Sequence, residues 1–300
     1  MLLLLLILAF SLTKILSLVC SKLCSNTLTS GGIVGNAIYI FFVSLISCVT
    51  YSAFTGFSYE FDKTTIILSV ALAFSSVASL LISLVIYRIA SVSGVNVVTT
   101  SLSLVTSAMI GFLVFDETAD TIKILRIVIM VLAGIFVYFD NISKQKDKDK
   151  NTGNKKYLFF IIIACLLLIN CYTTIQSKFL STGKLVSDVN TFFFMTNVYM
   201  LIGSLSVILF MLVKKPSEVK KNLVLLKPKS IITMTGNTFG SDVSVVLNVL
   251  ILARMDLSVF TMISSAIGII SAAVVSVLFR EKLGTYAKIA IALSLVVAVM

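Results

Sequence analysis

The 300-residue sequence contains little charge and almost no proline, and it has no histidine or tryptophan. Charged residues make up 12% of the chain and hydrophobic residues 58%. Soluble domains typically carry about 25% charged residues, so a soluble domain is excluded and an integral membrane protein is expected. The absence of histidine also removes the usual proton shuttle and the commonest metal ligand.

The five cysteines show no spacing typical of a metal site or a redox motif, and we interpret them as free apolar thiols. They are Cys20, Cys24, Cys48, Cys165 and Cys171. The sequence also lacks a GxSxG nucleophile motif, an HExxH metal motif and a glycine-rich phosphate loop. We therefore expect no catalytic residues, no bound metal and no cofactor, and we predict that the chain is not an enzyme.

Long apolar runs are what the sequence does contain, and the two prolines, Pro216 and Pro228, leave them uninterrupted. A helix that crosses a bilayer needs about 20 mostly apolar residues. The hydropathy pattern predicts an all-α integral membrane protein with ten transmembrane helices. They are expected at about residues 1–19, 33–55, 66–87, 92–115, 122–139, 157–177, 190–213, 230–252, 257–279 and 285–300.

The net charge of +11 is concentrated in the predicted connections, above all in residues 140–156 and 214–229. Sixteen Lys and Arg fall in the odd-numbered connections and six in the even-numbered ones, which places the odd connections in the cytoplasm and both termini outside. The basic clusters fit topology determinants and solvated linkers, and they are also able to attract anionic membrane lipids or an acidic partner. Nucleic-acid binding is not expected, because no soluble module remains to carry it.

The two halves of the chain resemble each other, which predicts an internal repeat. Residues 88–117 run from Arg88 through an apolar stretch rich in Ser and Thr to Glu117, and residues 254–281 run similarly from Arg254 to Glu281. We predict a first five-helix repeat at residues 1–140, a basic linker at 141–156 and a second five-helix repeat at 157–300. An odd number of helices in each half makes the repeats inverted, an arrangement common in secondary transporters.

Phe115-Asp116-Glu117 and Phe279-Arg280-Glu281 look like the hydrophobic-Phe-x-Glu endings of the fourth and ninth helices of the drug/metabolite transporter superfamily, in particular the EamA-type ten-helix transporters. The resemblance covers the layout of nearly the whole chain. It implies that helices one to four and six to nine surround a central cavity. The tryptophan and proline landmarks that the family often has in its first and fourth helices are absent, and many relatives have both termini in the cytosol. We interpret the charged residues of the two motifs as turn and anchoring groups.

Two charged residues stand out well inside predicted helices, where a charge costs about 2.5–3.5 kcal/mol at the helix centre. Lys14 lies in the first helix and Asp242 in the eighth. If both line one cavity, they either pair with each other or bind opposite ends of a zwitterionic substrate. A carboxyl group held away from bulk water is also a candidate carrier of a coupling proton. The structural alternatives are a plain ion pair, or a Lys14 side chain that extends to the membrane interface.

Uncharged polar residues in the predicted helices complete the candidate substrate site. Asparagine is the stronger indication, because its amide needs several hydrogen-bond partners in an apolar environment. Close helix packing through small residues is the alternative for any single serine or threonine, and the tyrosines also fit interface or core positions. The candidates are Asn96, Thr100, Asn170, Tyr172, Asn197, Tyr199, Asn237 and Ser264.

We therefore predict a secondary transporter in the cell membrane that moves a small polar or amphipathic metabolite, such as an amino acid, a sugar or a drug-like compound, by alternating access. Export is the favoured direction, and proton coupling is a candidate mechanism. The alternatives are a lipid-carrier flippase of the same fold and a non-transporting scaffold subunit. The expected partners are a small-molecule substrate and membrane lipids, and a homodimer is compatible with the sequence.

Overall fold

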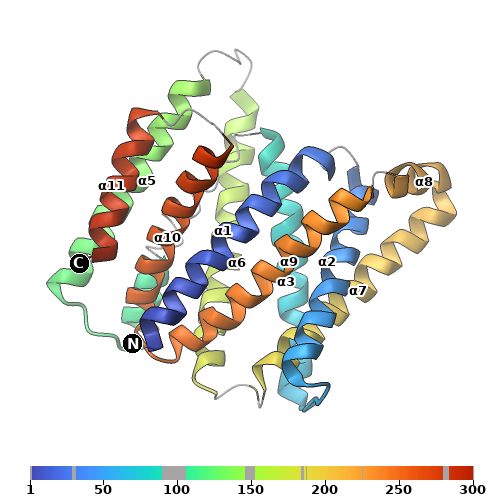
Figure 1. The fold of residues 1–300 in the computed structure, drawn as a ribbon, viewed down its shortest axis with the longest axis horizontal. Coiled ribbons are helices and arrows are strands. Elements are labelled where there is room, and N and C mark those ends of the chain that lie inside the picture. The colour runs from blue at the N-terminus through green and yellow to red at the C-terminus, as the bar shows by residue number, and fades with distance from the viewer. Residues whose placement is uncertain are drawn as a thin grey trace. The chain divides into compact units, whose positions relative to one another are not determined.

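The computed structural model describes residues 2–28, 32–89, 106–145, 153–183, 186, 188–224, 226–279 and 284–299, and the regular elements within these ranges are all α-helices. Figure 1 shows them in chain order. Their bounds are α1 Leu2–Leu28, α2 Gly32–Thr55, α3 Lys63–Ile89, α5 Thr121–Gln145, α6 Gly153–Ser181, α7 Val189–Lys214, α8 Pro216–Val224, α9 Pro228–Leu252, α10 Leu257–Leu278 and α11 Thr285–Val299. The predicted all-helical class is confirmed.

Nine of the ten predicted helices correspond to helices with these bounds. The remaining one, the fourth predicted helix at 92–115, lies largely outside the described residues, although residues 106–114 are helical. Three described segments are long and apolar enough to cross a bilayer, namely Leu2–Cys20, Val34–Thr55 and Val189–Lys214. A membrane location is therefore supported by length and composition.

Large apolar side chains on the surface of the described helices point to the same surroundings. Phe74, Ile232 and Val213 are 78%, 71% and 83% exposed, and many other Leu, Ile, Val and Phe side chains are exposed as well. Apolar side chains scattered singly over a surface are normal, but extensive exposed apolar area marks contact with a membrane or another protein. The outer faces of these helices are thus suited to lipid.

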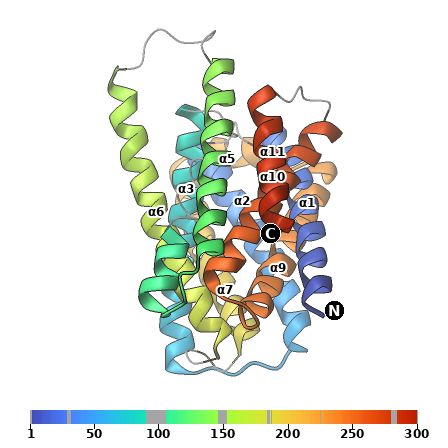
Figure 2. The same cartoon turned by 90° about the vertical axis from the view of Figure 1, so that its left-hand side faces the viewer.

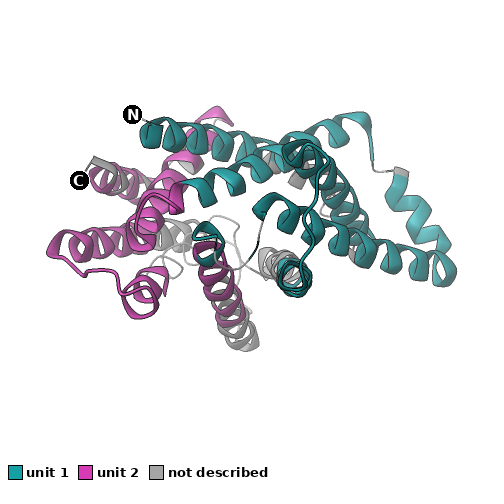
Figure 3. Ribbon diagram, turned by 90° about the horizontal axis from the view of Figure 1, so that it is seen from below, with its two compact units in different colours: residues 1–78, 179–250 teal, residues 79–178, 251–300 magenta. Residues whose placement is uncertain are grey.

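The chain divides into two compact units that do not coincide with the two halves of the sequence (Figure 3). Unit 1 comprises Met1–Ala78 and Phe179–Leu250, and unit 2 comprises Ser79–Lys178 and Ile251–Met300. Each unit therefore combines segments from both predicted repeats. The predicted repeats, 1–140 and 157–300, are consecutive halves of the sequence and differ from these contact-based units. The repeat boundaries therefore stay a prediction.

The core of unit 1 is formed where α2 packs along α7. The ring of Tyr51, which is 1% exposed, stacks on Phe193 with the ring centroids 5.5 Å apart. Leu180, Val186, Phe192 and Val249 complete this cluster. Stacked and edge-to-face aromatic pairs add about 0.5–1.5 kcal/mol beyond the area that they bury, so this contact fixes α7 against α2.

The short helix α8 is missing from the sequence prediction, which treated residues 214–229 as a charged connection. Pro216 begins the helix, a position where the missing N–H and the fixed φ of proline are favourable. Val219 is fully buried and packs with Val34 and Ile38 of α2. The spacing of Val219 and Leu223 is the helical signal in the sequence, and the abundance of Lys concealed it.

α1 approaches α9 very closely at Gly240. A Cβ atom at this position would lie 3.2 Å from the carbonyl oxygen of Thr13 and 3.3 Å from the backbone nitrogen of Ser17. Both neighbours are backbone atoms, which do not move aside as a flexible side chain does. Glycine is therefore required here for the contact between the two helices, as at the small-residue interfaces of membrane proteins.

We expect Gly240→Leu to separate α1 from α9 and to lower stability by about 1–3 kcal/mol, the usual cost of overpacking. Gly203→Leu is the matched control, because Gly203 lies on α7 with no atom within 4 Å of its Cβ position. Thermal unfolding of the purified protein in detergent measures both variants. Equal melting temperatures for the two variants would contradict the close contact.

Unit 2 is built around α5, α10 and α11, which lie side by side (Figure 2). Met130 of α5, Met262 and Ala266 of α10 and Val297 of α11 form its buried cluster, and each is at most 2% exposed. The rings of Phe136 and Tyr286 stack with their centroids 6.3 Å apart. The last predicted helix is therefore an integral part of this unit.

Candidate functional site

The polar face of α9 in unit 1 contacts both α1 and α2. The hydroxyl of Ser17 on α1 donates to Asn237 Oδ1 at 2.8 Å, and Asn237 Nδ2 donates to the hydroxyl of Tyr39 on α2 at 3.3 Å. One amide thus connects three helices. Buried amides need such partners, because leaving a buried polar group unpaired costs about 1–3 kcal/mol.

Asp242 follows Asn237 by a little more than one turn of α9, and its side chain is directed toward α2. Ser47 Oγ donates to Asp242 Oδ1 at 3.0 Å, and both residues are buried, at 2% and 8% exposure. Cys48 and Tyr51 of α2 also lie near Asp242. Asp242 Oδ2 has no hydrogen-bond partner among the described residues. A buried carboxylate with one satisfied oxygen is a strong indication of a site.

Lys14, the second charged candidate, does not pair with Asp242 in the described part of the chain. It is half-buried on α1, and its Nζ lies 5.3 Å from the centroid of the Phe10 ring, one turn earlier on the same helix. An ammonium group over an aromatic face is stabilised by about 0.5–2 kcal/mol. Lys14 follows directly after Thr13, which contacts Gly240, so it belongs to the segment of α1 that packs on α9.

The remaining candidates differ in how the structure places them. Asn197 uses its amide within its own helix, where Nδ2 donates to the Phe193 carbonyl at 2.9 Å, and Tyr199 is half-buried on α7. In unit 2, Tyr172 has a buried hydroxyl without a hydrogen-bond partner in the described ranges, and Ser264 is half-buried on α10. Asn96 and Thr100 lie outside the described residues, and so does the side chain of Asn170 on α6.

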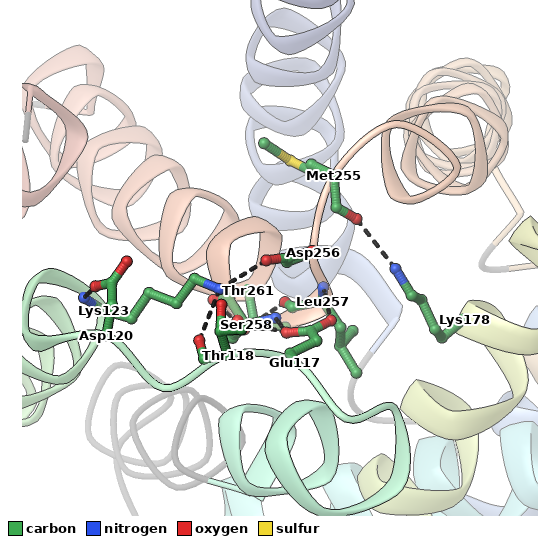
Figure 4. A network of polar contacts seen from close by, with 10 residues as sticks. All are labelled: Glu117, Thr118, Asp120, Lys123, Lys178, Met255, Asp256, Leu257, Ser258 and Thr261. Carbon is green, nitrogen blue, oxygen red and sulfur yellow. Dashed lines mark hydrogen bonds and ion pairs between the residues drawn. The ribbon is translucent and has the colours of Figure 1, made fainter.

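A second polar cluster, in unit 2, holds the beginning of α10 (Figure 4). The carboxylate of Glu117 accepts hydrogen bonds from the backbone N–H groups of Leu257 and Ser258 and from the Ser258 hydroxyl. Asp256 is the residue before the helix, but its side chain makes no capping bond. Glu117 therefore caps α10 from a different segment of the chain, and its negative charge suits the positive end of the helix dipole.

Asp256 is engaged by Lys123, whose Nζ lies 2.6 Å from Asp256 Oδ2 and also donates to the Thr118 carbonyl at 2.9 Å. Lys178 Nζ donates to the carbonyl of Met255 at 3.0 Å, just after α9 ends (Figure 4). A cation at the end of one helix and an anion at the beginning of the next both complement the helix dipoles. The turn between α9 and α10 is thus fixed from two sides, in agreement with the interpretation of Glu117 as an anchor.

Several residues of these clusters were not among the sequence candidates. The stripe of Ser44, Ser47 and Tyr51 on one face of α2 was detectable from its helical spacing. Lys123 and Lys178 were counted only as loop charges, yet the side chain of Lys123 is 9% exposed. No spacing rule identifies such a partner, because Asp256 is more than 130 residues away in the sequence.

No family model and no curated protein sequence matches the chain. A solved structure described only as "Crystal structure of protein" is similar to it in fold, with a TM-score of 0.67 and 10% sequence identity, over 96% of this chain and 93% of the other. At this identity the likeness concerns the fold alone. It places the helical architecture among known folds.

Proposed function

We propose that the chain is a ten-helix secondary transporter of the drug/metabolite transporter type, built from two inverted five-helix repeats, which moves a small polar or amphipathic metabolite across the cell membrane by alternating access. The observation that carries the proposal is the buried carboxylate of Asp242, with Oδ2 lacking a partner in the described residues. A charge held among apolar helices is expensive and is usually retained for ion or substrate binding.

The surroundings of Asp242 support this function over a purely structural role. A structural carboxylate would be expected to pair with a nearby cation, and Lys14 on the adjacent helix instead lies over its own Phe10 ring. Asn237 of α9, Ser17 of α1 and Tyr39 of α2 supply further polar groups a little more than one turn of α9 away. Polar side chains from three helices thus meet in one apolar unit, as expected of a substrate or coupling-ion site.

The test is transport by the purified full-length protein in proteoliposomes. Vesicles are loaded with radiolabelled amino acids, sugars or cationic drug-like compounds, and efflux is followed with and without an imposed proton gradient. We expect at least one compound to leave faster than from vesicles that contain heat-inactivated protein. Equal rates for every compound would contradict the transporter and would favour the scaffold alternative.

A further inference from the structure

α2 and α9 of unit 1 carry buried side-chain oxygen atoms that have no hydrogen-bond partner among the described residues. The contacts Tyr39 to Asn237 and Ser47 to Asp242 advance in the same direction along both helices, so the two helices run parallel here. Ser44 lies between the two contact levels on α2, on the same face as Ser47. Thr238 lies between the same levels on α9, one turn before Asp242. Ser44 and Thr238 thus lie within about one turn of Ser47 and Asp242, the two residues that are joined by a hydrogen bond.

These hydroxyls behave differently from others on the same helices. Thr50 and Ser52 on α2 donate to backbone carbonyls one turn earlier, and so does Thr235 on α9. Ser44 Oγ and Thr238 Oγ1 form no hydrogen bond with any described residue, although the two residues are 0% and 2% exposed. Buried hydroxyls normally find a partner. These two exceptions lie three residues before Ser47 on α2 and four residues before Asp242 on α9, and Asp242 Oδ2 itself lacks a partner among the described residues.

We propose that Ser44, Ser47, Thr238 and Asp242 form a binding site for a dehydrated alkali cation, with Na⁺ as its natural occupant. The donor set consists of oxygen atoms only, which hard cations prefer. One carboxylate balances one positive charge, and the described residues hold no group of three or more His, Cys, Asp or Glu suited to a multivalent metal. In the proposed transport function, this site would hold the coupling ion. Its role therefore rests on that function.

Size and hydrogen-bond count distinguish an alkali cation from the other monovalent ligands. The four residues are at most 8% exposed, so the interval admits a bare ion more readily than the head group of a substrate. A proton on Asp242 Oδ2 would satisfy that oxygen and at most one hydroxyl acceptor. A metal cation accepts lone pairs from the hydroxyls of Ser44 and Thr238 and from the Asp242 carboxylate at the same time.

Thermal unfolding of the full-length protein in detergent tests the site, with NaCl, LiCl, KCl or choline chloride at equal ionic strength. Binding to the folded state raises the melting temperature, and we expect NaCl to raise it by about 2 °C or more above choline chloride. Ser44→Ala and Thr238→Val are expected to lose most of this difference. Thr235→Val is the matched control, because Thr235 is exposed and bonds to its own helix, and it should keep the whole difference.

Thr238→Ser supplies a variant that retains the oxygen atom, and it should keep the Na⁺ effect if Thr238→Val fails to fold. Equal melting temperatures in NaCl and choline chloride would overturn the proposal and would leave a proton as the candidate ion. An Na⁺ effect that persists in Ser44→Ala and Thr238→Val would overturn the assignment to these residues. The Na⁺ site and the transport function can fail separately. The melting temperature reports Na⁺ binding whether or not the protein transports, and the proteoliposome assay reports transport whether or not Na⁺ binds.

Discussion

Replacing Asp242 with Asn should reduce transport in proteoliposomes by about tenfold or more, since each tenfold change corresponds to only about 1.4 kcal/mol of lost interaction. Asparagine keeps the volume of the side chain and an acceptor for Ser47, whose Oγ lies 3.0 Å from the carboxylate. The substitution removes the negative charge and one of the two oxygen atoms that could bind a cation or a proton. Folding should be retained, because a neutral side chain is easier to bury than a carboxylate.

Glu60→Gln is the matched control for this prediction. Glu60 is exposed in the connection between α2 and α3, and the substitution removes one negative charge there without changing the buried site. We expect Glu60→Gln to transport at the rate of the unmodified protein. If Asp242→Asn transports every substrate at that rate as well, Asp242 has no part in the mechanism.

Replacing Glu117 with Gln should destabilise the protein by about 1–3 kcal/mol, the cost of leaving buried donors without an acceptor. Glu117 accepts from two backbone N–H groups of α10 and from the Ser258 hydroxyl. A glutamine amide offers one oxygen in place of two, and its NH₂ group would face the N–H groups of the helix. The charge that complements the helix dipole is lost as well.

The melting temperature in detergent measures this effect, and a fall of several degrees is expected at about 2–4 °C per kcal/mol for a chain of this size class. Glu218→Gln is the control, because Glu218 pairs with Lys215 at 3.0 Å on the exposed side of α8. Exposed ion pairs contribute only about 0–1 kcal/mol, so Glu218→Gln should change little. A Glu117→Gln variant as stable as Glu218→Gln would mean that the cap does not hold α10.

The sequence predicted most of the helices, because long apolar runs without proline leave few alternatives. Residues 257–279 illustrate this, since α10 begins at the predicted residue and ends within one residue of the predicted end. α8 was missed for a physical reason. It has only 9 residues, too few to cross a bilayer, and its many charged residues hide the apolar ones. Only the burial of Val219 against α2 shows why the segment is helical.

The buried position of Asp242 could be predicted from the sequence, but its hydrogen-bond partner could not. An Asp inside a long apolar run indicates a buried charge, and Asp242 was chosen as a candidate on this ground alone. Its partner Ser47 could not be identified in this way, because helical periodicity specifies which face a residue occupies and not which helix covers that face. The same limit applies to Glu117, whose capping of α10 depends on a contact between segments 140 residues apart.

Cysteine accessibility at position 238 is the most direct test of the central claim that the Asp242 region serves transport. Thr238, now 2% exposed, is replaced by Cys in a variant whose native cysteines are changed to Ser, and the protein in sealed vesicles is treated with a membrane-impermeant maleimide. A carrier must open this region to water during its cycle, so we predict labelling from at least one side and slower labelling with a transported substrate. No labelling from either side, in protein that is folded, would show a permanently dry interior and contradict the proposed function.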